Sequence, residues 1–286
     1  MKKYLLFIIF MFAFLVNAEE KQLIIRCDDI GMSHAVNMAF KELLKTGYPL
    51  SASVMFNCAW YQEGVDILKE HPEVSVGVHL TLNAEWKNYR WGPITGKSLV
   101  PSLTDEEGYF FPSRAKFHAN NPKLEEIEIE LRAQIERALR TGLKIDYVDY
   151  HMGTAVDKPE HRAIVEKLAK EYNLGISRYF GEEDINNVYD DPVNSKTDSL
   201  VAIINDIDKP GTFLLVTHIG LNHPELAAME DLNPWGPKNM SESREGELKA
   251  LVSSEFSKIL NSKKIKLINY RELINLEGLN NMKNEE

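Results

Sequence analysis

Two spacings of hydrophobic residues alternate along the chain, and they predict a repeated order of strand and helix. Short apolar runs rich in β-branched residues are typical of buried strands, whereas apolar residues three and four positions apart are typical of helices packed on one face. The predicted strands are residues 22–27, 50–57, 74–82, 144–150, 175–180, 212–217 and 265–269. The predicted helices are residues 33–46, 60–70, 122–141, 159–173, 198–208, 244–261 and 272–279.

This order of elements predicts an α/β fold, because repeated β/α units form a parallel sheet whose outer face is covered by helices. The first strand is followed by Asp28-Asp29-Ile30-Gly31 and not by the glycine-rich phosphate loop of open nucleotide-binding sheets. We therefore predict a seven-stranded (β/α) barrel, similar to a TIM barrel and open to distortion. Long loops are expected after strands 3 and 6, at about residues 83–121 and 219–243.

The first residues of the chain have the pattern of a signal peptide. A short basic start precedes an apolar run over residues 4–16, and Val16 and Ala18 supply small residues for cleavage. The run is shorter than the roughly 20 residues of a comfortable membrane span, although an uncleaved anchor is the alternative. We expect residues 1–18 to be removed on export to the periplasm or medium, without a stable membrane span. Residues 19–286 then form a single domain, since no repeat or linker divides them.

The chain is acidic, with a formal net charge of −10 and no basic clusters. Such a balance argues against nucleic acid as a partner and fits a neutral or cationic small substrate. The only cysteines are Cys27 and Cys58, without the CxxC spacing of a redox or zinc site. Two buried free thiols are favoured over a disulfide. The oligomeric state is not addressed by any pattern in the sequence.

Residues that bind metals or move protons follow several predicted strands. Asp28 and Asp29 follow the first strand, whereas His79, His151 and His218 lie at the ends of the third, fourth and sixth. In a β/α barrel these ends form one rim, where active sites occur. One carboxylate with two imidazoles is a common ligand set for an open divalent metal site. The sequence thus predicts a metal centre, in preference to unrelated structural histidines and a helix cap.

The paired aspartates suggest different roles, one as a metal ligand and the other as a proton acceptor. Because adjacent strand residues face opposite ways, a turn must redirect one of them, and Gly31 permits it. A histidine that binds no metal suits general acid catalysis, and His218 is the candidate; a fourth ligand or a structural role is the alternative. His71 and His161 are expected at the surface. Three further histidines, His34, His118 and His223, are weaker candidates for the substrate cleft.

Six segments in the same order resemble the YdjC-like carbohydrate deacetylase family over essentially the whole mature chain. They are RCDDIGMS at 26–33 with Asn37, SASVMFN at 51–57, GVHLTL at 77–82, DYVDYH at 146–151, VTHIG at 216–220, and Arg244 with Glu247-Leu248. The resemblance implies a seven-stranded barrel and removal of the N-acetyl group from an amino-sugar or N-acetylated oligosaccharide.

The resemblance also implies a divalent metal, usually Mg²⁺, with Zn²⁺ as an alternative. By position, it makes Asp29, His79 and His151 the metal ligands, Asp28 the catalytic base and His218 the proton donor. Two departures concern the substrate. Gly153 replaces a second histidine of the fourth-strand motif, and Ile219 replaces a proline after His218.

The resulting hypothesis is hydrolysis of the acetamide by metal-bound water, with Asp28 accepting a proton and His218 protonating the departing amine. Arg178 or Arg244 would contact the substrate or keep the base ionised; surface ion pairs are the alternative. Trp91 and Trp235, in the two long loops, would pack on sugar rings, with ordinary loop packing as the alternative.

Three other functions share these residues. A metal-dependent phosphoesterase would need more cationic groups near the site. Another amidohydrolase would differ only in its pocket. A saccharide-binding protein without catalysis is the third, and Gly153 is the residue that favours it.

Overall fold

A computed structural model describes residues 20–283 apart from 235 and 237. The predicted signal peptide at residues 1–18 and the loop residue Trp235 therefore lie outside the described residues. Within the described part, none of the helices combines the length and the apolar character needed to span a membrane.

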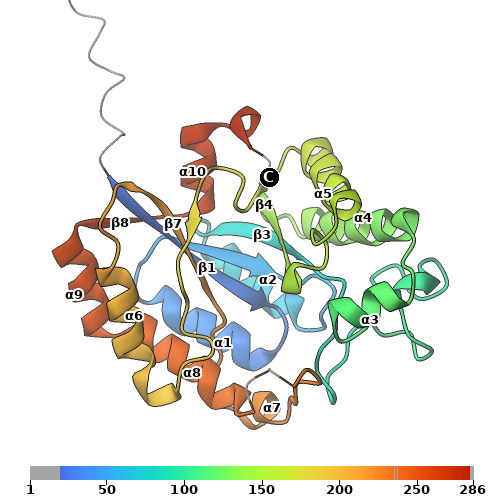
Figure 1. Cartoon of the computed structure of the whole chain (residues 1–286), viewed down its shortest axis with the longest axis horizontal. Coiled ribbons are helices and arrows are strands. Elements are labelled where there is room, and N and C mark those ends of the chain that lie inside the picture. The colour runs from blue at the N-terminus through green and yellow to red at the C-terminus, as the bar shows by residue number, and fades with distance from the viewer. Residues whose placement is uncertain (1–19, 235, 237, 284–286) are drawn as a thin grey trace, which may run out of the picture.

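All the described strands join one parallel sheet, which confirms the predicted fold class (Figure 1). The sheet order is β5-β4-β3-β2-β1-β7-β6, with β8 paired to β1 beside this path. It curls into a distorted barrel that stays open, because β5 and β6, at its two ends, do not pair within the described residues. The strands are β1 (Lys21–Ile30), β2 (Leu50–Val54), β3 (Ser75–Leu80), β4 (Ile145–Tyr150), β5 (Gly175–Ile176), β6 (Glu183–Asp184), β7 (Gly211–Thr217) and β8 (Ile265–Ile268).

Strand β1 is the centre of the sheet and pairs with three others. Its residues 21–27 pair with β7 along one edge. On the other edge, residues 21–24 pair with β8 and residues 25–27 with β2. The strand therefore reaches the C-terminal rim with neighbours on both sides, which fixes the residues that follow Cys27.

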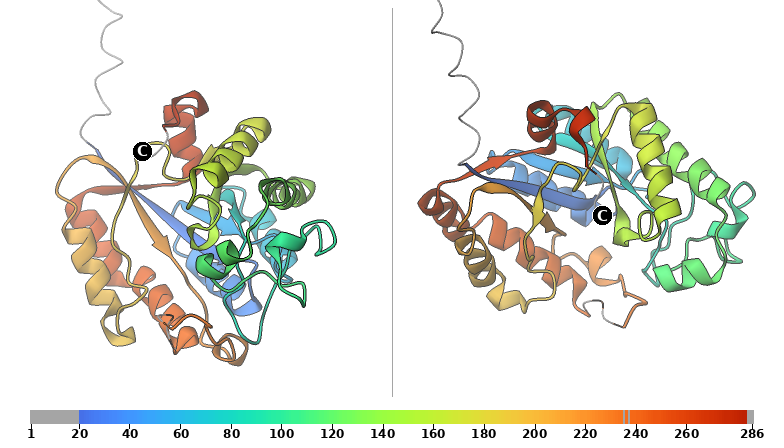
Figure 2. Two further views of the ribbon diagram at one scale, coloured as in Figure 1. Left: turned by 45° about the vertical axis from the view of Figure 1, so that its right-hand side comes forward. Right: turned by 45° about the horizontal axis from the view of Figure 1, so that its top comes forward.

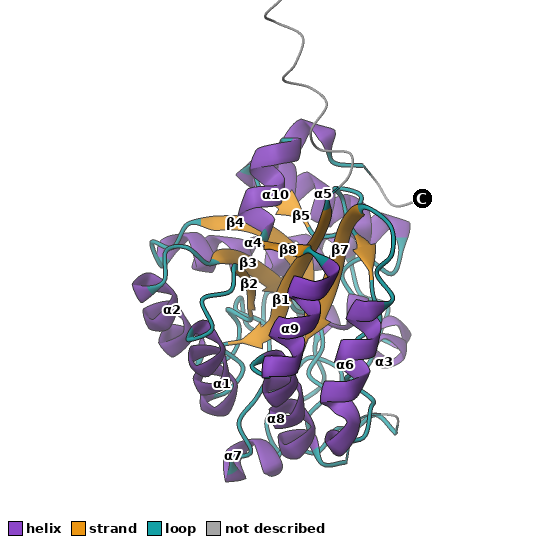
Figure 3. Cartoon of the chain, turned by 90° about the vertical axis from the view of Figure 1, so that its left-hand side faces the viewer, coloured by secondary structure: helices purple, strands orange, loops and turns teal. Residues whose placement is uncertain are grey.

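Helices surround the sheet. Figure 2 shows α4 and α5 at one side and α6, α8 and α9 at another, while Figure 3 places α10 and α7 at opposite ends of the molecule. The longer helices are α1 (His34–Leu44), α2 (Tyr61–Glu70), α4 (Leu124–Arg140), α5 (Pro159–Tyr172), α6 (Lys196–Asn205), α8 (Met240–Leu251), α9 (Ser254–Lys263) and α10 (Tyr270–Glu277). The shorter ones are α3 (Arg114–Ala119) and α7 (Pro224–Ala227).

Two apolar clusters show which way the strand residues face. In β1, Leu23 and Ile25 belong to the large cluster that also contains helix residues, whereas Ile24 belongs to a small cluster inside the barrel. Tyr270 from α10 completes this small cluster, so α10 closes the N-terminal end of the barrel. Since side chains alternate along a strand, Arg26 and Asp28 follow Ile24 on the inner face.

The structure departs from the predicted elements in several places. Strand β6 was missed because it is two residues long and both are charged and exposed. The helix predicted over residues 244–261 is wrong as a single helix, since α8 ends at Leu251 and Ser253 caps α9 by accepting a hydrogen bond from the Phe256 backbone. The long segment after β3 is confirmed, but it contains α3.

Candidate metal centre and catalytic site

Asp28 and Asp29 lie near the end of β1, on a bulge at the rim of the barrel. The pairing of β1 with β2 shifts register between Cys27 and Ile30. Asp29 has a φ of 65°, in the left-handed region, and Gly31 follows with a φ of 86°. The turn predicted from Gly31 therefore begins at Asp29 itself, and both carboxylates reach the interior.

Three side chains from three strands bring one ligand atom each to a common point. Asp29 Oδ1 is 3.5 Å from His79 Nε2 and 3.4 Å from His151 Nδ1, and the two nitrogens are 3.3 Å apart. All three residues are buried. The sequence predicted this set, and the structure brings it together.

The triangle has the size that a divalent ion requires. Ligand atoms about 2.1 Å from one ion, at angles between octahedral and tetrahedral, lie about 3.0–3.4 Å apart. Asp29 Oδ1 is buried and has no hydrogen-bond partner among the described residues. A buried carboxylate oxygen without a partner is costly unless a cation neutralises it. The residues present thus fit a metal ion.

Each of these three side chains also has a hydrogen-bond partner on the side that faces away from the shared point. Asp29 Oδ2 accepts a hydrogen bond from Arg244 at 2.7 Å. The other ring nitrogens are fixed by carboxylates, His79 Nδ1 by Asp149 at 3.0 Å and His151 Nε2 by Glu85 at 2.9 Å. Carboxylate partners of this kind orient metal-binding imidazoles and select their tautomer.

Asp28 lies beside the triangle and is fixed by a buried arginine. The guanidinium of Arg26 donates to both carboxylate oxygens of Asp28, at 2.7 and 2.8 Å, and its Nε is 3.1 Å from Asp149. Burial alone would raise the pKa of Asp28, but the charge of Arg26 lowers it to about 2. Asp28 is therefore ionised at neutral pH.

His218 follows β7 and is uncharged in the free protein. Burial lowers the pKa of its imidazole to about 4, although the charges of Asp29 and Asp28 oppose this shift. Its backbone N–H donates to Glu247 at 2.9 Å, and its ring meets Tyr189 edge-on with centroids 4.9 Å apart. The Nδ1 atom is buried and lacks a partner in the described residues. His218 can thus accept a proton before it donates one.

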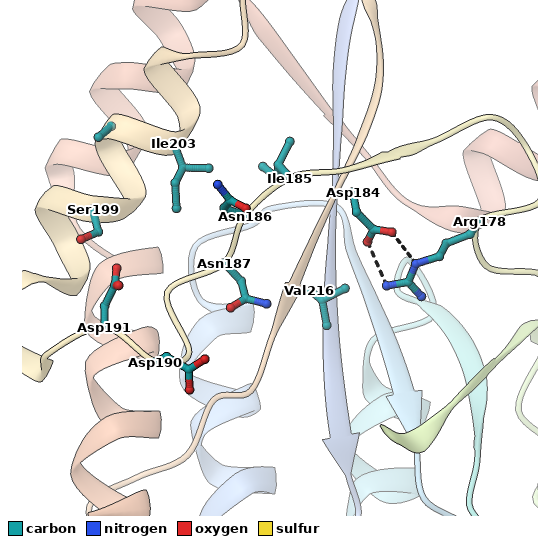
Figure 4. A pocket seen from close by; sticks show the side chains of 11 residues that line it. Arg178, Asp184, Ile185, Asn186, Asn187, Asp190, Asp191, Ser199, Ile203 and Val216 are labelled. Carbon is teal, nitrogen blue, oxygen red and sulfur yellow. Dashed lines mark hydrogen bonds and ion pairs between the residues drawn. The ribbon is translucent and has the colours of Figure 1, made fainter. Parts of the chain in front are cut away.

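The two predicted arginines are both engaged with carboxylates. Arg244 forms an ion pair with Asp29 and not with Asp28. Arg178 is bound to Asp184 through two hydrogen bonds of 2.5 and 2.8 Å (Figure 4). The pair lines a polar cavity of about 710 Å³ beside Val216 of β7. The residue that keeps Asp28 ionised is instead Arg26, so the expectation for Arg178 and Arg244 in that role is wrong.

Trp91 is buried beside His151. Its ring centroid lies 6.0 Å from that of His151, and its Nε1 donates to the backbone oxygen of Asn83. Only 5% of Trp91 is exposed. Its side chain therefore lines one side of the site and does not form an open surface for a sugar ring.

The remaining histidines and cysteines have separate places. His161 was expected at the surface, but it is buried, with its ring stacked on that of His118. Cys27 and Cys58 are both buried free thiols, as predicted.

Sequence reasoning gave no role to four residues of the site. Arg26 and Asp149 each precede a predicted site residue, Asp28 or His151, by two positions, so the strand period could have given them a role. Arg26, Asp149 and Glu247 were noted only as parts of motifs. Glu85 lies in the long segment after β3, where no periodicity places it.

The chain belongs to the YdjC-like protein family, whose model matches residues 22–262. A carbohydrate deacetylase from Brevibacillus brevis is 31% identical over 268 residues, which cover 88% of this chain and 99% of that protein. A carbohydrate deacetylase from Thermoanaerobacter pseudethanolicus is 27% identical, covering 87% of this chain and 98% of the relative.

Solved structures show the same fold. A putative cellobiose-phosphate cleavage protein from Enterococcus faecalis superimposes with a TM-score of 0.73 at 24% identity, covering 89% of this chain and 99% of that one. The Xyl-CE4 domain of a xylanase from the hindgut metagenome of Trinervitermes trinervoides gives 0.53 at 11% identity, covering 93% and 96%.

Proposed function

We propose that this protein is a metal-dependent carbohydrate deacetylase that removes the N-acetyl group from an amino-sugar or N-acetylated oligosaccharide. The observation that supports it most is the triangle of Asp29, His79 and His151 next to the ionised carboxylate of Asp28. The full-length similarity to carbohydrate deacetylases supports the substrate class. The signal peptide pattern supports export as part of the same proposal.

Asp29, His79 and His151 would hold a divalent ion. Mg²⁺ follows from the family resemblance, whereas two imidazoles and one carboxylate are a donor set that suits Zn²⁺ better. A bound divalent ion supplies a water of lowered pKa and polarises a carbonyl group.

The protein's own side chains would move the protons. Asp28 is ionised and His218 uncharged at neutral pH, so both can accept a proton and neither carries one at the start. Asp28 would accept a proton from the attacking water and pass it to His218. The resulting imidazolium would then protonate the departing amine, which leaves Asp28 ionised and His218 uncharged again.

The charges of the site favour an amide over a phosphate ester. Three arginines near it are paired with acids, Arg26 with Asp28, Arg178 with Asp184 and Arg244 with Asp29. A phosphate group would have to compete with these carboxylates for its cationic partners. A neutral acetamide does not.

Acetate release from chitin-type oligosaccharides tests the proposal. Asp28→Asn should lower kcat by about 10²–10⁴-fold, the usual contribution of a general base, while metal content stays unchanged. Asp208→Asn is the matched control, because this exposed aspartate forms an ion pair with Lys263 outside the site. Tight sugar binding by the unaltered protein without acetate release would show a binding protein instead, and phosphate release would show an esterase.

A further inference from the structure

A second group of metal-binding side chains lies outside the site described above. His118 of α3, Asp157 before α5 and His161 in the first turn of α5 each offer one ligand atom, and these atoms lie within 4.8 Å of one another. We propose that they form a second cation site, of the class that takes Zn²⁺.

The contacts within this group place both imidazoles around one carboxylate. His118 Nε2 is 2.6 Å from Asp157 Oδ2, and His161 Nδ1 is 3.3 Å from Asp157 Oδ1. The two rings are stacked, with centroids 5.4 Å apart and an angle of 23° between their planes. Two nitrogens and a carboxylate in this arrangement are a zinc ligand set.

A fourth donor is within reach. The backbone oxygen of Thr154 lies 3.4 Å from His161 Nδ1. Three side chains and one carbonyl would complete four-coordination. The separation between His118 and Asp157 would have to widen by about 0.5 Å to reach the spacing of atoms that share one ion, and the His118 side chain, 22% exposed, has room to move.

The surroundings have the features of a built site. The side chains of His161 and Asp157 are only 2% and 13% exposed. Phe117 packs edge-on against both imidazoles, with ring centroids 5.4 Å from His118 and 6.1 Å from His161.

An ion here would fasten the long segment after β3 to the segment that follows His151. Helix α3 belongs to the former and Thr154 to the latter. The Thr154 hydroxyl also donates to the Asn83 side chain, and the Asn83 backbone accepts the hydrogen bond of Trp91. The second ion would thus have a structural role. It would stabilise the segment with Asn83 and Trp91, which lies beside the triangle of Asp29, His79 and His151.

Zinc binding to tag-free, chelator-treated protein tests this site, with the stoichiometry measured by dialysis and elemental analysis. The unaltered protein should bind two equivalents, and His118→Gln, which keeps a hydrogen-bonding group toward Asp157, should bind one. His71→Gln is the matched control, because His71 contacts one carboxylate, Glu73, at 2.9 Å among the described residues; it should still bind two.

The same experiment separates the two sites. Asp29→Asn should also bind one equivalent, and zinc should raise its melting temperature, whereas the rise should vanish in Asp29→Asn/His118→Gln. If the unaltered protein binds only one equivalent and His118→Gln binds none, the result would support this second site and contradict the metal centre proposed for catalysis. A stoichiometry that His118→Gln leaves unchanged, at one or at two, would overturn the second site.

Discussion

Single residues decide the chemistry of the site through their partners. His79 and His151 are ordinary strand-end histidines in the sequence, but Asp149 and Glu85 fix the ring nitrogens that face away from the proposed ion. A carboxylate on the far nitrogen increases the basicity of the ligand and holds its orientation. The aspartates and histidines could be predicted from their positions, whereas Glu85 could not, since only tertiary folding brings it to His151.

This partnership gives a prediction for metal affinity. Glu85→Gln should weaken zinc binding at the first site by about 10–100-fold, the usual effect of removing such a partner, with little change in fold. Glu73→Gln removes a carboxylate from a similar contact, 2.9 Å from His71, outside the site. Calorimetric titration should show the loss only for Glu85→Gln; equal affinities would contradict the role given to Glu85.

Arg26 orients Asp28, the proposed base, as Asp149 and Glu85 orient the two histidines. Its planar guanidinium binds both oxygens of Asp28 and also reaches Asp149, a geometry that lysine cannot reproduce. Arg26→Lys should therefore lower kcat by about 10–100-fold with a smaller change in KM. Steady-state kinetics on an N-acetylated oligosaccharide measures both constants, and an unchanged kcat would show that charge alone suffices.

At the scale of elements, the periodicity of the sequence predicts most of the structure. Strands with continuous apolar runs were found, because a parallel sheet buries both of its faces. Strand β6 was missed because its two residues are charged and exposed. The boundary between α8 and α9 was missed because the apolar spacing continues through it, although Ser253 is an N-cap residue. Helix α3 lies in a segment without any pattern.

Strand β3 depends on a close approach that only glycine permits. A Cβ atom at Gly77 would lie 2.4 Å from the ring of Tyr147 on the neighbouring strand β4. Tyr147 is fully buried and its hydroxyl is hydrogen-bonded to Ser53 at 2.8 Å, so the ring has little freedom to move. Gly77→Ala should lower the free energy of unfolding by about 1–3 kcal/mol, measured by urea denaturation.

The double variant tests the cause of that loss. Gly77→Ala/Tyr147→Leu removes the ring that the new methyl group would meet. The two changes should therefore cost less together than the sum of their separate effects. Additive losses would place the cost of the Gly77 substitution somewhere other than in this contact.

For the whole molecule, stability depends on pH through a buried acid behind His218. Burial raises the pKa of Glu247 to about 7, although the hydrogen bond from His218 and the charges of Lys196 and Arg244 oppose the shift. Between its unfolded pKa of about 4.5 and 7, the folded state keeps a proton that the unfolded chain has lost. Glu247 should therefore destabilise the protein progressively as pH rises through this range, by about 1.4 kcal/mol per pH unit at most.

Glu247→Gln separates this contribution from those of other groups. The amide still accepts the hydrogen bond from the His218 backbone but does not titrate. The gain in stability of the variant over the unaltered protein should be larger at pH 7.5 than at pH 5. Urea denaturation of both proteins at both pH values measures this difference. A difference in stability that is the same at both pH values would contradict the raised pKa.

Anomalous X-ray diffraction from zinc-soaked crystals tests directly whether Asp29, His79 and His151 hold one divalent ion. An anomalous peak is expected within about 2.0–2.2 Å of Asp29 Oδ1, His79 Nε2 and His151 Nδ1 together. A map with no peak among these three atoms, from crystals in which zinc binds elsewhere, would contradict the proposed metal centre.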